Sequence, residues 1–310
     1  MPYKGTSSAS APDLFALVGP TAVGKTARAI ELAQRFEGEI VSADSRQIYR
    51  GMDIGTAKPT RDEQAQAPHH LIDIVHPDEF YTLAQYQDDA YAAIDDILAR
   101  GKQPFLVGGT GLYIRAVVEG LRIPRVPPNE ELRAQLAAQD GAALYERLCA
   151  LDPDAAARID PRNVRRTIRA LEVCLMTGAR FSELGKSTPP PYRITQIGLT
   201  SSRSELYARI DARIDRMMAD GLVAEVQTLV AQGYGWELPS MSGLGYRQIG
   251  EYLRGEASLD TAVANIRRAT RDFVRRQYAW FRLRDERIHW YESARFTEIE
   301  AFVQAAKRGV

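Results

Sequence analysis

The 310-residue chain is poor in cysteine and histidine, and it has no excess charge of either sign. Its two cysteines, Cys149 and Cys174, form no C-x-x-C pair, which excludes a disulfide framework and agrees with a reducing compartment. The four histidines lack the spacing of a zinc site, so we expect hydrogen-bonded loop histidines. Because 40 basic residues balance 40 acidic ones, any surface that attracts an anion must be local.

Long apolar segments are also missing. No apolar run reaches the roughly 18 residues that a membrane-spanning helix needs. The N-terminal stretch MPYKGTSSASAPD lacks the apolar core of a signal peptide. We therefore expect a disordered tail over residues 1–13 of a cytoplasmic protein, with no membrane partner and no evident obligate protein partner.

Short apolar runs at residues 14–18, 39–43 and 103–107 indicate buried strands, and helical periodicity lies between them. This alternation predicts an α/β fold: a parallel sheet with helices on both faces, whose ligands bind beyond the carboxyl ends of the strands. The Pro-rich segments IPRVPPNEE and KSTPPPYR border a helical block, which predicts an all-helical insertion domain at 121–193. The core domain then comprises residues 14–120 and 194–310, with a returning strand at TQIGLT and mostly helices after it.

The segment GPTAVGKT fits the phosphate-binding P-loop pattern G-x-x-x-x-G-K-[ST], and it lies between a predicted strand and a predicted helix. In such a loop, backbone N–H groups and the helix N-terminus bind phosphate oxygens. Lys25 then reaches the outer phosphates, and the Thr26 hydroxyl serves Mg²⁺ directly or through a water molecule. The predicted phosphate ligands are Gly19, Pro20, Thr21, Ala22, Val23, Gly24, Lys25 and Thr26.

Asp44 follows the second predicted strand and should face the same site. Its carboxylate can hold Mg²⁺ or act as a general base, and the alternative is an ordinary helix-cap or turn aspartate. The third strand ends in Gly108-Gly109-Thr110-Gly111, where a P-loop ATPase usually has an acid, which weakens the ATPase interpretation. Glycines there let a bulky ligand approach the backbone, and Thr110 offers it a hydroxyl.

Arginines are concentrated in three segments. Arg158, Arg162, Arg165, Arg166 and Arg169 predict a basic stripe on one helix face, and IRRATRDFVRRQYAWFRLRDER interleaves arginines with aromatic residues. Guanidinium groups pair with phosphates and aromatic rings stack on unpaired bases, so nucleic acid is one interpretation and a solvated helix face the other. In the third segment, RIDARIDRMMADGLVAEV, Arg209, Arg213 and Arg216 share a helix face. A phosphate clamp by one of them and salt bridges to Asp211, Asp215 and Asp220 are equally supported by the spacing.

Several segments together resemble the tRNA dimethylallyltransferase family, in that family's order from about residue 14 to residue 282. They are GPTAVGKT, SADSRQIYRGMDIGTAKP, PHHLID, YTLAQY, LVGGTGLYIRAVVEGL, DPRNVRRTIRALEV, GLGYRQI and TRDFVRRQYAWFR. The resemblance implies transfer of a dimethylallyl group from its diphosphate to N6 of the adenosine 3′-adjacent to the anticodon, in tRNAs that read codons beginning with U.

The resemblance also implies roles for single residues. Asp44 would be the general base, while Lys25, Thr26, Arg213 and Mg²⁺ would hold the diphosphate. Besides Asp44, the residues implied to contact the tRNA anticodon stem-loop are Ser45, Arg46, Gln47, Thr110, Arg133, Arg165, Arg166, Thr167, Ile168, Arg169, Ser242, Gly243, Leu244, Gly245, Tyr246, Arg247, Arg276, Gln277, Trp280 and Arg282. A P-loop nucleotide or small-molecule kinase is the main rival, and a binding-only RNA protein would leave Lys25 and Asp44 unexplained.

Overall fold

A computed structural model describes residues 11–184 and 187–308 of the chain, so most of the predicted tail lies outside the described residues. The chain divides into two compact units. The first comprises Met1–Ile114 with Pro191–Val310, and the second is Arg115–Pro190. The second unit begins inside helix α4 (Gly111–Val118) and ends before the returning strand, so both of its limits precede the predicted 121 and 193.

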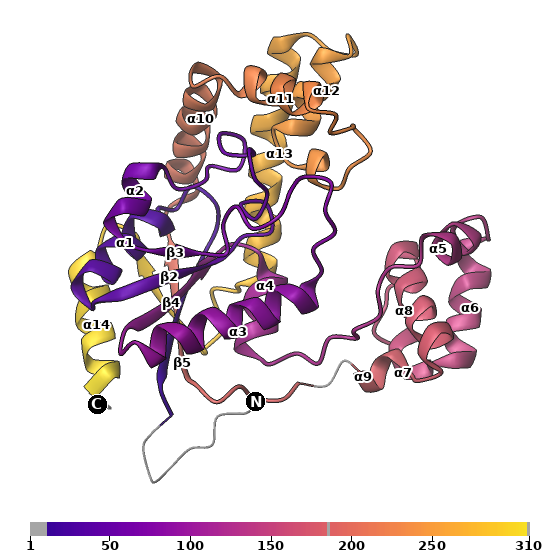
Figure 1. Ribbon diagram of the computed structural model, residues 1–310, viewed down its shortest axis with the longest axis horizontal. Helices are drawn as coiled ribbons and strands as arrows, with labels where there is room; N and C mark the ends of the chain where they lie inside the picture. The colour runs from indigo at the N-terminus through magenta and orange to yellow at the C-terminus, as the bar shows by residue number, and fades with distance from the viewer. Residues whose placement is uncertain (1–10, 185–186, 309–310) are drawn as a thin grey trace. The chain divides into compact units, whose positions relative to one another are not determined.

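Six strands form one parallel sheet across the described residues, in the order β3-β2-β4-β1-β5-β6 (Figure 1). The central strands are β2 (Gly38–Ala43), β4 (Gln103–Gly108), β1 (Asp13–Val18) and β5 (Arg193–Thr200), so the predicted α/β class and parallel sheet are confirmed. The edge strands β3 (His69–His70) and β6 (Ile288–Glu292) were not predicted. The first has two residues, and the second buries only Ile288, so neither leaves a clear apolar run.

Helices cover both faces of the sheet. Helix α1 (Lys25–Arg35) contributes Ile30 and Leu32 to a core cluster with Phe15 of β1, and α14 (Phe296–Arg308) joins the same cluster. Helix α3 (Leu83–Ala99) contacts β2 and β4 and buries Tyr86 and Ile94. Successive residues of a strand point to opposite faces of the sheet, so the helices on the two faces bury both sets of side chains. The edge at the carboxyl ends of the strands is where ligands bind in such sheets.

The remaining helices of the first unit are α2 (Arg61–Gln66), α10 (Arg203–Ala219), α11 (Leu222–Ala231), α12 (Tyr246–Leu253) and α13 (Leu259–Trp280), with a short 3₁₀ turn η1 (Ser240–Ser242) before α12. Helix α10 is tied to α13 by ion pairs of Asp211 with Arg271 and of Asp215 with Arg267. Asp211 and Asp215 of α10 thus pair with α13 instead of with the arginines of their own helix. This leaves the arginine face of α10 available to the P-loop.

The second unit contains α5 (Glu130–Ala137), α6 (Gly141–Leu151), α7 (Pro153–Ala156), α8 (Val164–Thr177) and α9 (Phe181–Leu184). Its regular elements are helices in the part that the structure describes, apart from an isolated bridge between Leu121 and Ser187. Leu136, Leu144 and Leu171 form its own core. No helix in residues 11–184 and 187–308 combines the length and apolarity needed to cross a membrane.

The prediction of one continuous arginine stripe in this unit was wrong. Asn163 caps α8, its side chain accepting the N–H of Arg166, so Arg158 and Arg162 precede the helix. Arg162 pairs with Asp160 instead. Because Asn is a strong N-cap residue, the helix begins there rather than running back through the earlier arginines.

Candidate functional site

The carboxyl ends of three strands bring the P-loop, Asp44 and the Gly-rich turn together, as expected for features that each follow a predicted parallel strand. Val18 of β1 and Ala43 of β2 both lie opposite Gly108 of β4. The N–H of Thr110 donates to the Ala43 carbonyl at 3.2 Å, and its hydroxyl accepts the N–H of Ser45 at 3.0 Å. Asp44 is therefore fixed between the P-loop and the turn at residues 108–111.

The P-loop has backbone angles that its sequence explains. Gly24, the residue before α1, has φ +100°, and a Cβ there would lie 2.9 Å from the Ser293 hydroxyl. Glycine is thus favoured by the backbone conformation, and a larger residue would also have to displace the Ser293 hydroxyl. Ala22 also has a positive φ of 64°, a strain of the kind that surrounding structure must hold at functional sites.

The ammonium group of Lys25 points back into the loop, donating to the carbonyls of Gly19 at 3.0 Å and Pro20 at 2.8 Å. Burial of this group and the nearby guanidinium of Arg213 lower the pKa of Lys25 to about 7, although the Asp44 carboxylate opposes the shift. Because this ammonium group is poorly solvated, an anionic ligand beside it would strongly stabilise its protonated form. The arrangement favours a phosphate group at Lys25.

Helix α10 supplies the second cation of the site. Arg213 donates to the Thr21 hydroxyl at 3.1 Å, and Arg209 donates to the Val23 carbonyl at 3.4 Å. Burial, followed by the charge of Arg216, lowers the pKa of Arg213. Of the two interpretations left open for this helix, the structure gives the one in which Arg213 lies at the P-loop.

Helix α13 contributes a polar bridge beneath these cations. The Gln277 side chain accepts the N–H of Thr21 at 2.8 Å and donates to the Gly109 carbonyl at 3.0 Å. It is only 3% exposed, so it lies under the surface that the family resemblance assigned to tRNA. Its observed contacts join the P-loop to the Gly-rich turn.

Asp44 combines a structural contact with access to the site. One carboxylate oxygen accepts the N–H of Arg46 at 2.9 Å. This is the contact expected from the alternative interpretation of Asp44 as a turn aspartate. The side chain nevertheless lines both cavities of the site, and it lies close enough to Lys25 and Arg213 for its charge to oppose the lowering of both pKa values. The hydrogen bond within the turn thus positions the carboxylate, and the side chain still faces the cavities.

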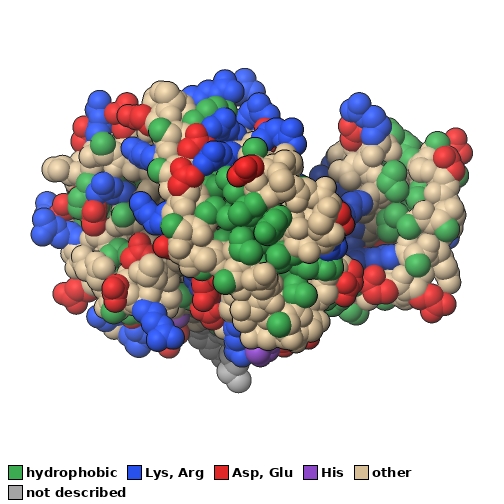
Figure 2. Space-filling view, turned by 90° about the horizontal axis from the view of Figure 1, so that it is seen from above, with side chains coloured by type: hydrophobic (Ala, Val, Ile, Leu, Met, Phe, Trp, Pro, Cys, Tyr) green, Lys and Arg blue, Asp and Glu red, His purple; other side chains and the backbone are tan. Residues whose placement is uncertain are grey.

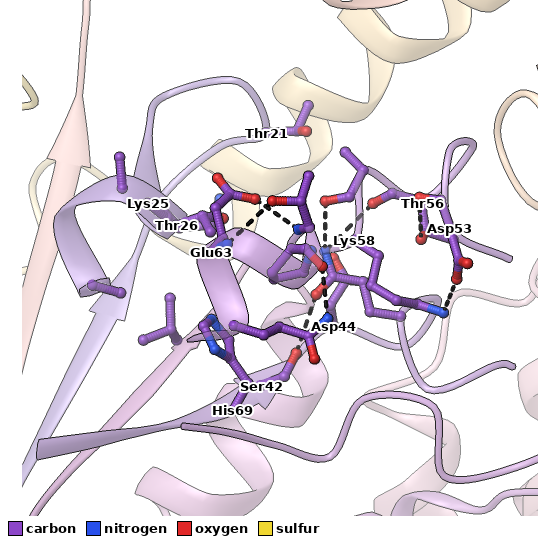
Figure 3. A pocket seen from close by; sticks show the side chains of 18 of the residues that line it. Thr21, Lys25, Thr26, Ser42, Asp44, Asp53, Thr56, Lys58, Glu63 and His69 are labelled. Carbon is purple, nitrogen blue, oxygen red and sulfur yellow. Dashed lines mark hydrogen bonds and ion pairs between the residues drawn. The ribbon is translucent and has the colours of Figure 1, made fainter. Parts of the chain in front are cut away.

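Two cavities meet at Asp44. The larger, of about 880 Å³, includes Lys25, Thr26, Lys58 and Glu63, and Figure 3 shows these side chains around it. The smaller, of about 590 Å³, is lined by predicted tRNA contacts from four parts of the chain: Ser45, Arg46, Thr110, Ser242, Gly243, Leu244, Gly245, Tyr246, Arg247, Arg276, Gln277 and Trp280. Gln47 lines the larger cavity instead, and Arg282 lines neither. The residues common to both cavities are Thr21, Ala22, Asp44, Thr56, Ala57, Arg213 and Met217.

The predicted tRNA contacts in the second unit have different surroundings. Arg165 and Arg166 are exposed, whereas Thr167 is buried. Arg133 and Arg169 both pair with Glu172, whose side chain is fully buried. Burial alone would raise the pKa of Glu172, but its hydrogen bonds with these arginines hold the pKa below the usual range. Ile168 packs against the core of this unit. Arg133 and Arg169 therefore already stabilise a buried carboxylate, and their contact with tRNA stays a prediction.

The loop at residues 53–58 was missed as part of the site. Lys58 is buried and pairs with Asp53 and Asp73, while its ammonium group also donates to the Tyr49 carbonyl at 2.8 Å. This loop forms one wall of both cavities. The turn-forming GT pair in MDIGTAKP indicates a loop, but no local pattern shows that it folds back beside the P-loop.

The oxygen ligands of the site fit Mg²⁺ when it binds together with a phosphorylated ligand. Thr26 and Asp44 both line the larger cavity, and Mg²⁺ is commonly bound through one or two protein oxygens, substrate phosphates and water. The described residues contain no group of three His, Cys, Asp or Glu side chains that could hold a metal. A Mg²⁺ ion bound here would therefore take some of its ligands from the phosphate.

Comparisons with known proteins agree with this geometry. A family model described as IPP transferase matches residues 47–284, and one described as Isopentenyl transferase matches residues 12–73. The chain is 60% identical over 273 residues to a tRNA dimethylallyltransferase of Roseiflexus castenholzii, covering 87% of this chain and 89% of that protein.

Two solved structures are also similar. The tRNA isopentenylpyrophosphate transferase of Bacillus halodurans is 40% identical with a TM-score of 0.71, covering 94% of this chain and 96% of that one. A eukaryotic dimethylallyltransferase acting on tRNA is 26% identical with a TM-score of 0.79, covering 96% of this chain and 77% of that one.

Proposed function

The chain belongs to the IPP transferase family and is a prenyl transferase that modifies tRNA, and we propose that it attaches a dimethylallyl group to N6 of the adenosine 3′-adjacent to the anticodon. The donor would be dimethylallyl diphosphate and the acceptors tRNAs that read codons beginning with U. One observation carries the proposal: the P-loop cavity and the cavity of predicted tRNA contacts share Asp44. A donor and an acceptor held in the two cavities would meet at this carboxylate.

The leaving diphosphate is the first chemical problem of this reaction. Breaking the allylic C–O bond places negative charge on the departing oxygen, and fixed cations aimed at that charge lower the barrier. Lys25 contacts the Gly19 carbonyl and Arg213 contacts the Thr21 hydroxyl, so both cations lie at the P-loop, where they could receive this charge. Mg²⁺, held by Thr26 and the diphosphate, would supply further charge neutralisation.

The weak nucleophile is the second problem. The exocyclic amine of adenine must lose a proton as it attacks the allylic carbon, and a positioned carboxylate can accept that proton. Asp44 is held by the N–H of Arg46 and adjoins Ser45 and Thr110, which lie on the acceptor side. An anticodon-loop base is already unpaired, so extruding it into this cavity costs only a few kcal/mol at most.

A transfer assay tests the proposal. The protein is incubated with tRNA, Mg²⁺ and labelled dimethylallyl diphosphate, and in parallel with ATP labelled in its γ-phosphate. We expect label in tRNA from the prenyl donor, located at the adenosine after the anticodon. Phosphate transfer from ATP without prenyl transfer would instead establish the kinase interpretation.

The lowered pKa of Lys25 predicts proton uptake on ligand binding. Above pH 7 most Lys25 in the free protein is neutral, because its pKa is about 7. A bound pyrophosphate stabilises the protonated form, so Lys25 contributes the uptake of about one proton to binding at pH 8, and the affinity contributed by Lys25 falls as pH rises. Calorimetry in two buffers of different ionisation enthalpy measures this number. Lys25→Met should remove the uptake, and an unchanged proton count in that variant would contradict the assignment.

The exposed arginines of α8 predict a salt effect. In Figure 2, Lys and Arg side chains lie among Asp and Glu side chains on the face that is drawn. We expect Arg166→Ala to reduce the slope of log Kd for tRNA against log salt by about 0.7–0.9. Arg162→Ala is the matched control, because Arg162 pairs with Asp160. Equal slopes for wild type and Arg166→Ala would remove Arg166 from the interface.

A further inference from the structure

The loop at residues 53–58 forms a wall where the two cavities meet. Thr56 and Ala57 line both cavities, Ile54 lines the larger and Gly55 the smaller. Ala57 has a positive φ of 49°, which an L-residue adopts only when its surroundings hold it there. The shape of this wall therefore depends on the contacts that fix the loop.

Glu225 of α11 holds the loop from outside the cavities. One carboxylate oxygen accepts the N–H groups of Asp53 at 3.0 Å and Ile54 at 2.7 Å. The other accepts the N–H of Gly55 at 3.1 Å and the hydroxyl of Tyr246 at 2.6 Å. Four donors match the acceptor capacity of a carboxylate, so this single side chain fixes three successive backbone groups.

Tyr246 closes the same contact from α12. Its side chain is 1% exposed, and a Cβ added to Gly55 would lie 2.4 Å from its ring. Burial and the Glu225 carboxylate raise the pKa of the Tyr246 hydroxyl, which therefore stays a proton donor. Tyr246 is also part of the 242–247 segment that lines the smaller cavity, so it connects the acceptor side to the loop.

The opposite side of the loop is fixed separately. Gln47 donates to the carbonyl of Ala57 at 3.2 Å, and Lys58 is buried against Asp53 and Asp73. These contacts keep the loop folded when the Glu225 contact is weakened. A change at Glu225 should therefore shift the wall rather than unfold it.

We propose that Glu225, together with Tyr246, is a positioning residue that sets the wall of the donor cavity and thereby the length of prenyl chain accepted. The inference rests on the proposed function, because it assumes a prenyl diphosphate with its phosphates in the P-loop. A displaced wall leaves the P-loop contacts intact but gives the five-carbon tail a poorer fit. It also makes room for a longer chain.

Glu225→Gln and Tyr246→Phe test this proposal. The amide leaves at least one loop N–H without an acceptor, and phenylalanine removes only the hydroxyl. For each we expect the KM for dimethylallyl diphosphate to rise about tenfold, and the preference in kcat/KM for dimethylallyl over geranyl diphosphate to fall about tenfold. Inhibition by pyrophosphate, which reports on the P-loop alone, should stay within about twofold. Tyr252→Phe, on the same helix, is the control and should match wild type.

The double variant separates a shared role from two independent ones. If the two side chains act through one contact, Glu225→Gln with Tyr246→Phe should lose little more than either single change. An unchanged chain-length preference would overturn the inference. So would a KM for dimethylallyl diphosphate and an inhibition constant for pyrophosphate that rise by the same factor, together with a lower melting temperature. Failure of the wild-type chain to transfer any prenyl group would overturn the proposed function as well.

Discussion

Replacing Lys25 with alanine is expected to lower prenyl transfer by about 10³-fold while leaving the protein folded. The ammonium group is placed among the backbone carbonyls of the P-loop beside Arg213, where it can stabilise charge on a departing diphosphate. Single-turnover rates at saturating tRNA and donor measure the chemical effect directly. Circular dichroism and the melting temperature report whether the fold is intact.

The stability of this variant has an expected sign. A lysine whose pKa is about 7 in the folded protein and 10.5 when unfolded binds fewer protons in the folded state between these values. Its charge therefore opposes folding most strongly below pH 7, and stability rises with pH across this window. Lys25→Ala should thus be no less stable than wild type at pH 6. A fully active Lys25→Ala protein would refute the assigned role.

Replacing Asp44 with alanine is expected to reduce the transfer rate by about 10²–10⁴-fold, with a much smaller change in tRNA affinity. The carboxylate lies at the junction of the two cavities, whereas the predicted tRNA contacts extend far beyond it. Asp44→Asn is the sharper variant, because its side-chain oxygen can still accept the N–H of Arg46 and preserve the turn. It cannot act as the base.

Two measurements separate the possible roles of Asp44. The Kd for tRNA should change by less than about threefold in both variants, since each phosphate or base contact elsewhere is kept. If rate and tRNA affinity instead fall together, Asp44 would be a binding residue rather than the base. A normal rate in Asp44→Asn would show that its contribution is the turn geometry.

The sequence predicted those parts of the fold that depend on local patterns. The strand–loop–helix context of GPTAVGKT and the apolar runs at residues 14–18 and 103–107 identified the parallel sheet and its ligand-binding edge. Edge strand β6 was missed because it buries only one side chain. The start of α8 was placed wrongly because the arginine spacing suggested a longer helix, whereas Asn163 caps the helix.

The parts of the site that could not be predicted depend on contacts between distant segments. Nothing in the sequence near Glu225 indicates that its carboxylate receives the N–H groups of residues 53–55. Similarly, the arginines of α13 look like a binding surface, yet Arg267 and Arg271 pair with the aspartates of α10. Spacing shows which residues share a helix face but not which neighbour that face meets.

The Gln277 bridge has a consequence for folding order. Thr21 and Gln277 are 256 positions apart, so the contact between them closes most of the chain into one loop. Contacts of such long range form late, because the chain entropy of loop closure must be lost before they stabilise anything. During synthesis the P-loop would leave the ribosome long before α13 exists. Its full set of supporting contacts can therefore form only after the C-terminal helices have been made and packed.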